Sequence, residues 1–179
     1  MIEEVVLVNE KDEAVGAMEK MAAHEQAILH RAFSVFVFNT AGDVLMQQRA
    51  HSKYHSGGLW TNTCCSHPRP GEHVAEAASR RLQEEMGFTT SLTKVFDFTY
   101  KANFDNGLTE YEFDHVFTGQ YDGPVDFNTE EVAAYSFMPA QELEQQIQET
   151  PERFTAWFHI AYPALKAWMA EPQNQIHAV

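Results

Sequence analysis

The run from Arg31 to Phe38 places the strongest constraint on the fold of this 179-residue chain. Its eight residues, Arg-Ala-Phe-Ser-Val-Phe-Val-Phe, are rich in β-branched and aromatic side chains, which favour a strand buried on at least one face. A turn at residues 39–43 follows, and Val44 to Gln48 is predicted to return as the partner strand of a hairpin. Val5 to Val8 is predicted to be a short edge strand. The fold is therefore expected to contain a buried central sheet.

A helix is predicted after Pro70-Gly71, and it is expected to cover this sheet. Its apolar positions recur every four residues and form one stripe: Val74, Ala78, Leu82 and Met86. Gly87 follows the stripe at the position where a helix C-cap favours a positive φ. Glu84 and Glu85 therefore lie on the last helical turn, next to a loop.

The second half of the chain predicts another hairpin and then two helices. Strands at Phe96 to Tyr100 and Leu108 to Thr118 flank Asp105-Asn106-Gly107, a strong turn signal. Helical patterns follow at residues 141–148 and 154–169. This order of elements predicts an α/β (α+β) fold with a mixed sheet sandwiched by helices. No linker or repeat divides residues 1–179, so a single domain is expected.

Composition limits the partners of the chain. A net charge of −14 argues against nucleic acid as a partner, because no basic stripe is available to neutralise phosphates. No apolar run approaches the ~20 residues of a membrane span, and the acidic N-terminus does not resemble a signal peptide. We therefore expect a cytoplasmic protein that does not bind membranes and is a monomer or weak dimer. An anionic substrate would need local cations or a bound metal to approach it.

Two carboxylates, Glu110 and Glu112, lie at strand spacing in the predicted second hairpin. Residues i and i+2 of a strand share one face and stand about 7 Å apart. By itself this pattern is more typical of a solvent-exposed strand edge, and Asp114 on the same face supports that interpretation. The alternative is that a cation lies between the carboxylates and offsets their repulsion.

Nine histidines are many for an acidic chain of this size. His24 and His30 precede the first central strand, and His67 follows Cys65. Imidazole and carboxylate groups together suit a borderline divalent ion such as Zn²⁺, Mn²⁺ or Fe²⁺. These residues are far apart in the sequence, and single histidines are usually surface or capping residues, so the metal site stays a hypothesis at this point.

The adjacent cysteines, Cys64 and Cys65, cannot join distant elements by a disulfide, and we expect free thiols. A free cysteine is most often a small buried apolar residue. The segment Cys65-Ser66-His67-Pro68 is rich in turn formers and precedes a helix, where partial exposure and a lowered thiol pKa are plausible. The residues themselves do not decide which of the two cysteines is reactive.

The predicted helix carries an incomplete form of the Nudix box, Gly-x5-Glu-x7-Arg-Glu-U-x-Glu-Glu-x-Gly-U. Glu72 and the run from Arg80 to Phe88 fit the pattern, but Ser66 replaces the leading glycine and Arg81 replaces a glutamate. In Nudix hydrolases these carboxylates hold Mg²⁺ against a diphosphate. The exchange of a carboxylate for a cation indicates diphosphate binding without hydrolysis. An exposed amphipathic helix end with Arg–Glu pairs is the structural alternative.

Over nearly its whole length the chain resembles the type I isopentenyl-diphosphate isomerases, which belong to the Nudix superfamily. The segments that carry the resemblance occur in the family's order and near its spacing: Glu19-Lys20, His24, 30–34, 48–50, 52–53, 60–62, 65–68, 71–72, Arg80-Arg81, Glu85, Gly87, Tyr100, 110–112 and Trp157. One departure is Gly57-Gly58, where relatives often carry Pro-Gly.

The resemblance implies a role for each of these side chains. The metal ligands would be His24, His30, His67, Glu110 and Glu112, with Cys65 and Glu85 also counted as ligands. Glu85 would serve a second ion, Mg²⁺, that accompanies the diphosphate, while the first site would hold Mn²⁺, Zn²⁺ or Mg²⁺. The phosphate contacts would be Lys20, Arg49, Lys53 and Arg81. The catalytic residues would be Cys65, Glu112, Tyr100 and Trp157.

The implied activity is the interconversion of isopentenyl and dimethylallyl diphosphate in isoprenoid precursor biosynthesis. A double bond moves when one carbon gains a proton and its neighbour loses one, through a tertiary carbocation. Cys65 and Glu112 would be the acid/base pair, Tyr100 would assist Glu112, and the indole face of Trp157 would stabilise the cation. The alternatives are a Nudix-type diphosphate hydrolase, which Arg81 and the cysteine segment disfavour, and a non-enzymatic metal- or diphosphate-binding protein.

Overall fold

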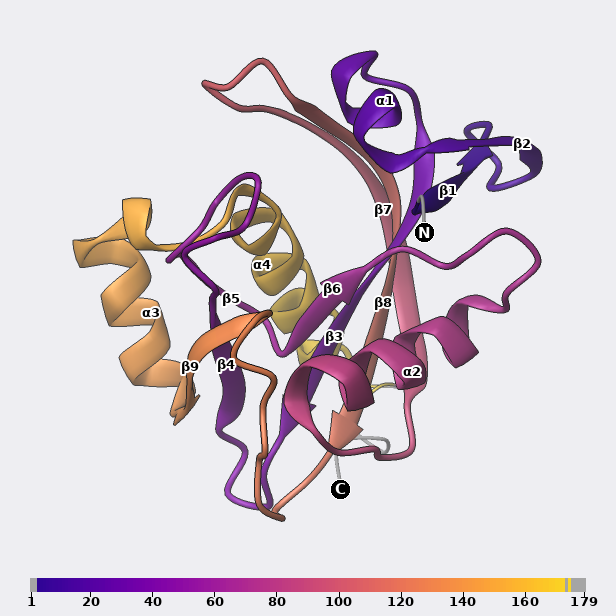
Figure 1. Ribbon diagram of the computed structural model, residues 1–179. Helices are drawn as coiled ribbons and strands as arrows, with labels where there is room; N and C mark the ends of the chain where they lie inside the picture. The colour runs from indigo at the N-terminus through magenta and orange to yellow at the C-terminus, as the bar shows by residue number, and fades with distance from the viewer. Residues whose placement is uncertain (1–2, 173, 175–179) are drawn as a thin grey trace.

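The predicted central strand is confirmed as β3 (His30–Phe38), which lies inside a nine-stranded mixed sheet (Figure 1). The computed structural model describes residues 3–172 and 174. β3 runs parallel to β8 (Thr109–Gln120), in register from His30–Glu112 to Phe38–Gln120. Along its other edge, β3 pairs antiparallel with β6 (Cys64–Ser66). These three neighbouring strands bring the histidine, glutamate and cysteine segments together.

The other strands extend the sheet in both directions. Each of them pairs antiparallel with its neighbour: β7 (Thr93–Asn103) with β8, β4 (Val44–Arg49) with β3, β5 (Trp60–Thr61) and β9 (Val132–Met138), and β1 (Glu4–Val8) with β2 (Ala14–Glu19) and β3. The predicted hairpin of β7 and β8 is therefore present, with longer strands than the sequence pattern indicated. The chain also turns between β3 and β4 as predicted, but the two strands pair at Phe38–Val44 and then diverge, and β4 runs along β9 instead.

Helices cover both faces of the sheet, as predicted (Figure 1). α2 (Val74–Met86) packs on one face, and its C-cap Gly87 has a φ of 77°, the left-handed conformation expected of a C-cap glycine. α3 (Ala140–Glu149) and α4 (Ala156–Ala170) lie toward the other face, joined by the 3₁₀ turn η1 (Pro151–Arg153). The short α1 (Lys20–Glu25) follows β2 directly and ends near the start of β3.

The alternation of side chains along β3 explains this sandwich. Phe33, Val35 and Val37 pack with the apolar stripe of α2 in one buried cluster. Phe36 points the other way and packs with Phe158 and other residues of α4 in a second cluster. A strand buried on both faces requires the nearly continuous apolar run that the sequence shows.

One strand prediction was wrong. β1 is not an edge strand, because it pairs with β2 on one side and reaches β3 through Leu7–His30 on the other. The exposed edge strand is β2, whose sequence Ala-Val-Gly-Ala-Met-Glu has too little β-branched and aromatic content to stand out. The strands β5, β6 and β9 and the helix α1 were also not predicted.

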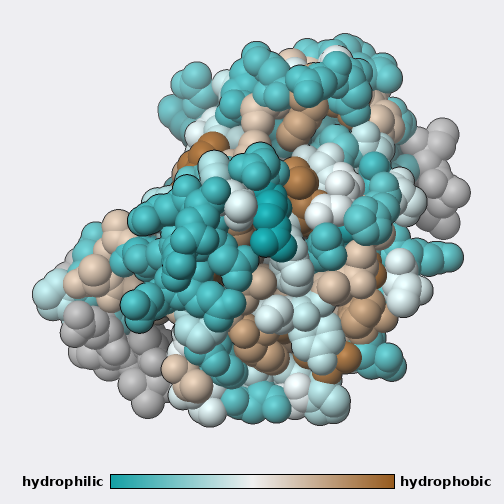
Figure 2. Space-filling model, turned by 90° about the vertical axis from the view of Figure 1, so that its left-hand side faces the viewer, coloured by the Kyte–Doolittle hydropathy of each residue, from teal (hydrophilic) through white to brown (hydrophobic). Residues whose placement is uncertain are grey.

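Among the described residues, no helix is long and apolar enough to cross a membrane. Hydrophilic residues cover most of the face seen in Figure 2, and hydrophobic residues form small separate patches there. In the described part of the chain, the exposed large hydrophobic residues are Val15, Tyr135 and Ile160.

Candidate active site

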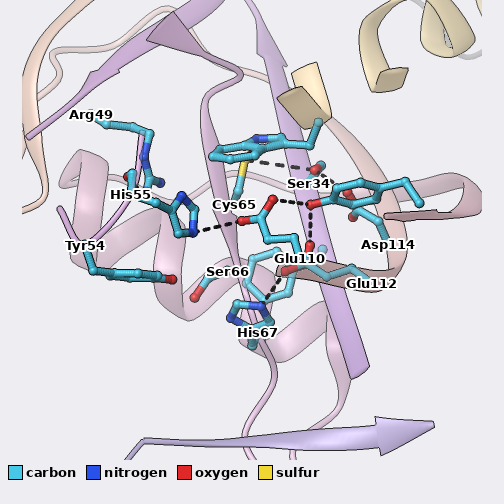
Figure 3. A pocket seen from close by; sticks show the side chains of 13 residues that line it. Ser34, Arg49, Tyr54, His55, Cys65, Ser66, His67, Glu110, Glu112 and Asp114 are labelled. Carbon is cyan, nitrogen blue, oxygen red and sulfur yellow. Dashed lines mark hydrogen bonds and ion pairs between the residues drawn. The ribbon is translucent and has the colours of Figure 1, made fainter. Parts of the chain in front are cut away.

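A small polar cavity lies where β3, β6 and β8 run side by side (Figure 3). Its volume is about 40 Å³, and its lining combines imidazoles, carboxylates and one thiol. The chemically active lining residues are Ser34, Arg49, Tyr54, His55, Cys65, Ser66, His67, Tyr100, Glu110, Glu112, Asp114 and Trp157. The parallel register of β3 and β8 sets this composition, since His30 lies directly beside Glu112.

Three of the predicted metal ligands surround one oxygen of Glu112. Its Oε1 lies 2.9 Å from His67 Nε2, 3.4 Å from His30 Nε2 and 4.0 Å from His24 Nε2. Both His24 and His30 are fully buried. Tertiary structure thus converts four residues scattered over almost ninety positions into one group whose ligand atoms all lie within 4.8 Å of one another.

The hydrogen bonds of the two buried histidines prepare them for a metal. His24 donates from Nδ1 to the Lys20 carbonyl at 2.7 Å, and His30 donates from Nδ1 to the Ile28 carbonyl at 2.8 Å. Their Nε2 atoms are buried without a hydrogen-bond partner. A backbone carbonyl that fixes Nδ1–H leaves the Nε2 lone pair free for an ion. The side chains therefore fit a divalent metal, and such a site would explain buried atoms that are otherwise unsatisfied.

The pKa shifts of these histidines follow from burial and from Glu112. Burial lowers the pKa of His24, and it lowers that of His67 to about 4. Burial also lowers the pKa of His30, but the contact with the Glu112 carboxylate raises it by more. Since a metal binds the neutral imidazole, it competes with protons for these nitrogens.

Glu110 and Glu112 share the hydroxyl of Tyr100, which lies 2.9 Å from Glu110 Oε2 and 2.7 Å from Glu112 Oε2. Burial and the charge of Glu112 raise the pKa of Glu110 well above its usual value. Burial opposes the charge of Glu112 as well, but contacts with His30 and His67 lower its pKa well below the usual value. The two carboxylates of one strand face thus differ in protonation, and neither faces solvent.

Cys65 lies at the wall formed by β6, and its sulfur is held from two sides. The thiol donates to Asn62 Oδ1 at 3.0 Å and accepts from the Trp157 indole N–H at 3.0 Å. Burial, followed by the negative charge of Asp114, raises the pKa of Cys65 to about 12. The expectation of a lowered pKa was therefore wrong, whereas the expected partial exposure of Cys65 is confirmed. Cys64 is fully buried within the apolar cluster beneath α2.

Trp157 has two contacts in the cavity. Besides its hydrogen bond to Cys65, its ring lies 5.2 Å from the Arg49 guanidinium, which is within cation–π distance. The residue is 3% exposed and comes from the first turn of α4, so it both packs in the core and lines the cavity. Packing in the core and contact with the Cys65 thiol are thus compatible for this tryptophan.

The other predicted phosphate-binding cations, Lys20, Lys53 and Arg81, are not among the residues that line the cavity. Arg81 and Lys53 share Glu131, with Arg81 Nη2 at 3.3 Å, and Arg81 also pairs with Glu85 at 2.6 Å. Glu85 is buried and accepts a second hydrogen bond from Gln47 at 2.9 Å. Gln47 in turn donates to the Thr63 carbonyl, just before the cysteines.

Lys20 approaches from α1 on the other side. Its ammonium lies 4.8 Å from the centre of the Tyr54 ring and pairs with Glu3 at 2.8 Å. Tyr54 itself lines the cavity. The four cations therefore belong to three separate segments: α1, the end of β4 with its following loop, and α2.

Comparison with known proteins identifies the family of the chain. A NUDIX domain model matches residues 28–158, which is more than half of the chain. An isopentenyl-diphosphate Delta-isomerase of Pectobacterium atrosepticum is 49% identical over 173 residues, covering 96% of this chain and 97% of the relative. A protein of the same name from Burkholderia multivorans is 47% identical, covering 94% and 98%. The chain belongs to the isopentenyl-diphosphate Delta-isomerase family.

Solved structures place this family member in the Nudix fold. The crystal structure of a protein from Deinococcus radiodurans superposes on this chain with a TM-score of 0.69 at 22% identity, covering 83% of this chain and 90% of that protein. The MutT protein of Methanosarcina mazei gives 0.65 at 17% identity, covering 80% and 96%. Such low identities demonstrate the shared fold and nothing about the chemistry.

Sequence reasoning missed several lining residues, of which His55 and Asp114 are the most important. His55 Nε2 lies 3.1 Å from Glu110 Oε1 and forms a second potential metal group with His24 and Glu110. Asp114 accepts from Ser34 at 2.7 Å, while its other oxygen is buried without a partner. The alternation Glu110, Glu112, Asp114 could have indicated Asp114. No local signal distinguished His55 from the other histidines. Cys65, counted among the metal ligands from the resemblance, belongs to neither metal group.

Proposed function

We propose that this chain interconverts isopentenyl diphosphate and dimethylallyl diphosphate. One observation carries the proposal: the Cys65 thiol and the Glu112 carboxylate line the same cavity. An allylic isomerisation requires one group that gives a proton and another that takes one. The names of the relatives that share 47–49% of their residues with this chain support the same substrate.

The proton balance of the reaction fits this pair. A proton added to the terminal alkene carbon leaves a tertiary carbocation, and removal of a proton from the neighbouring methylene forms the new double bond. In each direction one of Cys65 and Glu112 delivers a proton and the other accepts one, and the reverse reaction exchanges their roles. Tyr100 keeps Glu112 in place through its 2.7 Å hydrogen bond and also contacts Glu110.

The carbocation needs surroundings that are dry and rich in electrons. Trp157 lines the cavity beside Cys65, and an indole face can stabilise a desolvated cation by about 2 kcal/mol. The buried carboxyl groups of Glu110, Glu112 and Asp114 turn electron-rich oxygens toward the same space. Exclusion of bulk water also prevents its addition to the cation.

A divalent ion would be held by His24, His30, His67, Glu110 and Glu112. Its positive charge would stabilise the ionised form of the ligating carboxylates and so tune their acidity. At the substrate's other end, Arg49, Lys53, Lys20 and Arg81 would bind the diphosphate, and Glu85 would hold a Mg²⁺ ion that accompanies it. These cations offset the repulsion that the net charge of −14 exerts on an anion.

A diphosphate hydrolase is less well supported. Hydrolysis needs carboxylates that are free to hold metal along the Nudix box. Here Arg81 stands in a carboxylate position, so the box has one metal ligand fewer, and it also pairs with Glu84 at 2.9 Å. Hydrolysis also gives no role to the thiol held between Asn62 and Trp157.

Incubation with isopentenyl diphosphate and Mg²⁺ in deuterated water, followed by NMR, tests the proposal. The expected product is deuterium-bearing dimethylallyl diphosphate without phosphate release. Release of phosphate would favour the hydrolase, and an unchanged substrate would favour a binding protein. The single domain over residues 1–179, the cytoplasmic location and the monomeric or weakly dimeric state stay predictions from the sequence.

A further inference from the structure

We propose that His55 is a further ligand of the metal centre, through which the loop between β4 and β5 (residues 50–59) closes onto the bound ion. This inference rests on the metal centre of the proposed function and extends it to a segment outside the predicted ligand set. The ion would then have four imidazoles, from His24, His30, His67 and His55, and the carboxylates of Glu110 and Glu112.

The contact between His55 and Glu110 has the geometry of two ligands rather than of a hydrogen bond. His55 Nε2 lies 3.1 Å from Glu110 Oε1, yet this nitrogen is buried without a hydrogen-bond partner. Two donors about 2.1 Å from one ion stand about 3.0 Å apart in an octahedron and about 3.4 Å apart in a tetrahedron. The contact of Glu112 with His30, at 3.4 Å, falls in the same interval, and its contact with His67, at 2.9 Å, lies just below it.

His24 connects the two groups of ligands. Its ligand atom lies within 4.8 Å of those of His30, His67 and Glu112, and it also lies within 4.8 Å of those of His55 and Glu110. One imidazole nitrogen has one lone pair and serves one ion. The two groups therefore describe one centre with shared membership, rather than two separate sites.

The ring of His55 is fixed as a ligand should be. It is 6% exposed and stacks on Phe104, with centroids 4.4 Å apart and planes inclined by 11°. Its Nδ1 lies 3.2 Å from the Ser56 hydroxyl, which leaves Nε2 to point at Glu110 (Figure 3). Asn106 donates to the Tyr54 carbonyl at 2.9 Å and ties the loop to the β7–β8 hairpin. Second-shell contacts of this kind orient metal-binding histidines.

The same loop joins the metal centre to the predicted diphosphate site. Arg49 precedes the loop and donates to the His55 carbonyl at 3.3 Å, while Lys53 lies two residues before His55. A metal that fixes His55 therefore also restrains the two cations on this segment. Metal binding is expected to order the loop and to tighten diphosphate binding.

Proton NMR of the full chain loaded with one equivalent of Co²⁺ tests the proposal directly. Each histidine that binds a paramagnetic ion through Nε2 gives one strongly shifted Nδ1–H signal that exchanges with solvent. Four such signals are expected, and three in His55→Gln. The matched control is His51→Gln, an exposed histidine on the same loop, which should retain four. Competition with a chelator should show about 10-fold or more weaker Co²⁺ binding in His55→Gln only.

The outcomes separate this inference from the proposed function. Three shifted signals in the unmodified protein, with unchanged affinity in His55→Gln, would overturn the role of His55 and leave the metal centre intact. The absence of shifted signals would overturn the metal centre itself. Far-UV circular dichroism and thermal melting of each variant establish whether it is folded. If His55→Gln does not fold, His55→Ala in the same measurements replaces it, with the same expected loss of one signal.

Discussion

The cavity and the helix α2 both gather ionisable side chains, but they differ in whether these side chains have partners within the protein. In the cavity, imidazole nitrogens of His24, His30 and His55 are buried without hydrogen-bond partners. Along the solvent side of α2, Arg80 binds Glu72 through two hydrogen bonds of 2.7 and 2.9 Å and also contacts Glu84. Arg80 thus has partners for its charge beside and within the helix, while the cavity leaves donor atoms available.

The unpaired nitrogens of the cavity lower the free energy of unfolding, whereas the ion pairs of the helix do not. Buried polar atoms without partners are destabilising by roughly 1–3 kcal/mol each, so they persist when a ligand or ion completes them. The paired charges of α2 need no ligand to be satisfied. Substitutions in the cavity should therefore impair chemistry and metal binding, while those in the helix pairs should impair stability.

The largest effect is expected from Cys65→Ala. Removal of the thiol eliminates one member of the acid/base pair, and turnover should fall by about 10⁴-fold. The measurement is deuterium incorporation into dimethylallyl diphosphate. Cys64→Ala is the matched control, since that neighbouring thiol lies in the apolar cluster under α2 and should affect stability alone. Full activity of Cys65→Ala would contradict the mechanism.

Glu112→Gln should follow, with turnover about 10³-fold lower and a reduced metal content. The amide cannot accept the proton and binds metal weakly, so both properties should change together. Turnover and metal content by elemental analysis are measured on the same sample. Glu84→Gln on α2 serves as the control, because its side chain is 39% exposed and contacts only arginines among the described residues. Normal rates and normal metal content in Glu112→Gln would disprove the dual role.

A smaller effect is expected from Tyr100→Phe. The substitution removes one hydroxyl that binds both Glu110 and Glu112 but retains the ring. Hydrogen bonds to charged groups contribute about 1.5–3 kcal/mol, so turnover should fall about 10- to 100-fold. The pH dependence of turnover should also shift, since the hydrogen bond from Tyr100 lowers the pKa of Glu110. An unchanged pH profile would exclude this role.

The smallest effect on activity is expected from Glu72→Gln, just before α2. Hydrogen bonds from Arg80 lower the pKa of Glu72, aided by the Arg69 backbone N–H. The ion pair therefore stabilises the fold above the unfolded pKa of about 4.3, and this contribution is lost as the pH falls through the lower folded value. We expect a loss of about 1 kcal/mol of unfolding free energy at pH 7 and little below pH 3.

Urea denaturation at both pH values measures the loss of unfolding free energy. If Glu72 affects stability alone, turnover at pH 7 should remain within about twofold of that of the unmodified protein. A large loss of turnover with unchanged stability would instead assign Glu72 to the active site and remove the contrast between the helix and the cavity.

The strands and helices with strong periodicity were predictable from the sequence. β3 followed from its β-branched and aromatic run, and α2 followed from a four-residue repeat that ends at Gly87. β2 and β6 were not predictable, because these strands of six and three residues of mixed character hold their conformation only through pairing with neighbours. Local patterns report local preferences, and short strands depend on partners elsewhere.

For the active site, the sequence determined the chemical inventory and, through its resemblance to one family, the role of each predicted side chain. Tertiary structure alone decided the environment. It placed His30 beside Glu112, because β3 and β8 pair in parallel across more than eighty residues. It also set the partly buried Cys65 near Asp114, so that the pKa of the thiol rises. It also brought His55 from a loop onto Glu110. Distances between remote segments and their exclusion of water arise only when the sheet is assembled, so no local pattern records them.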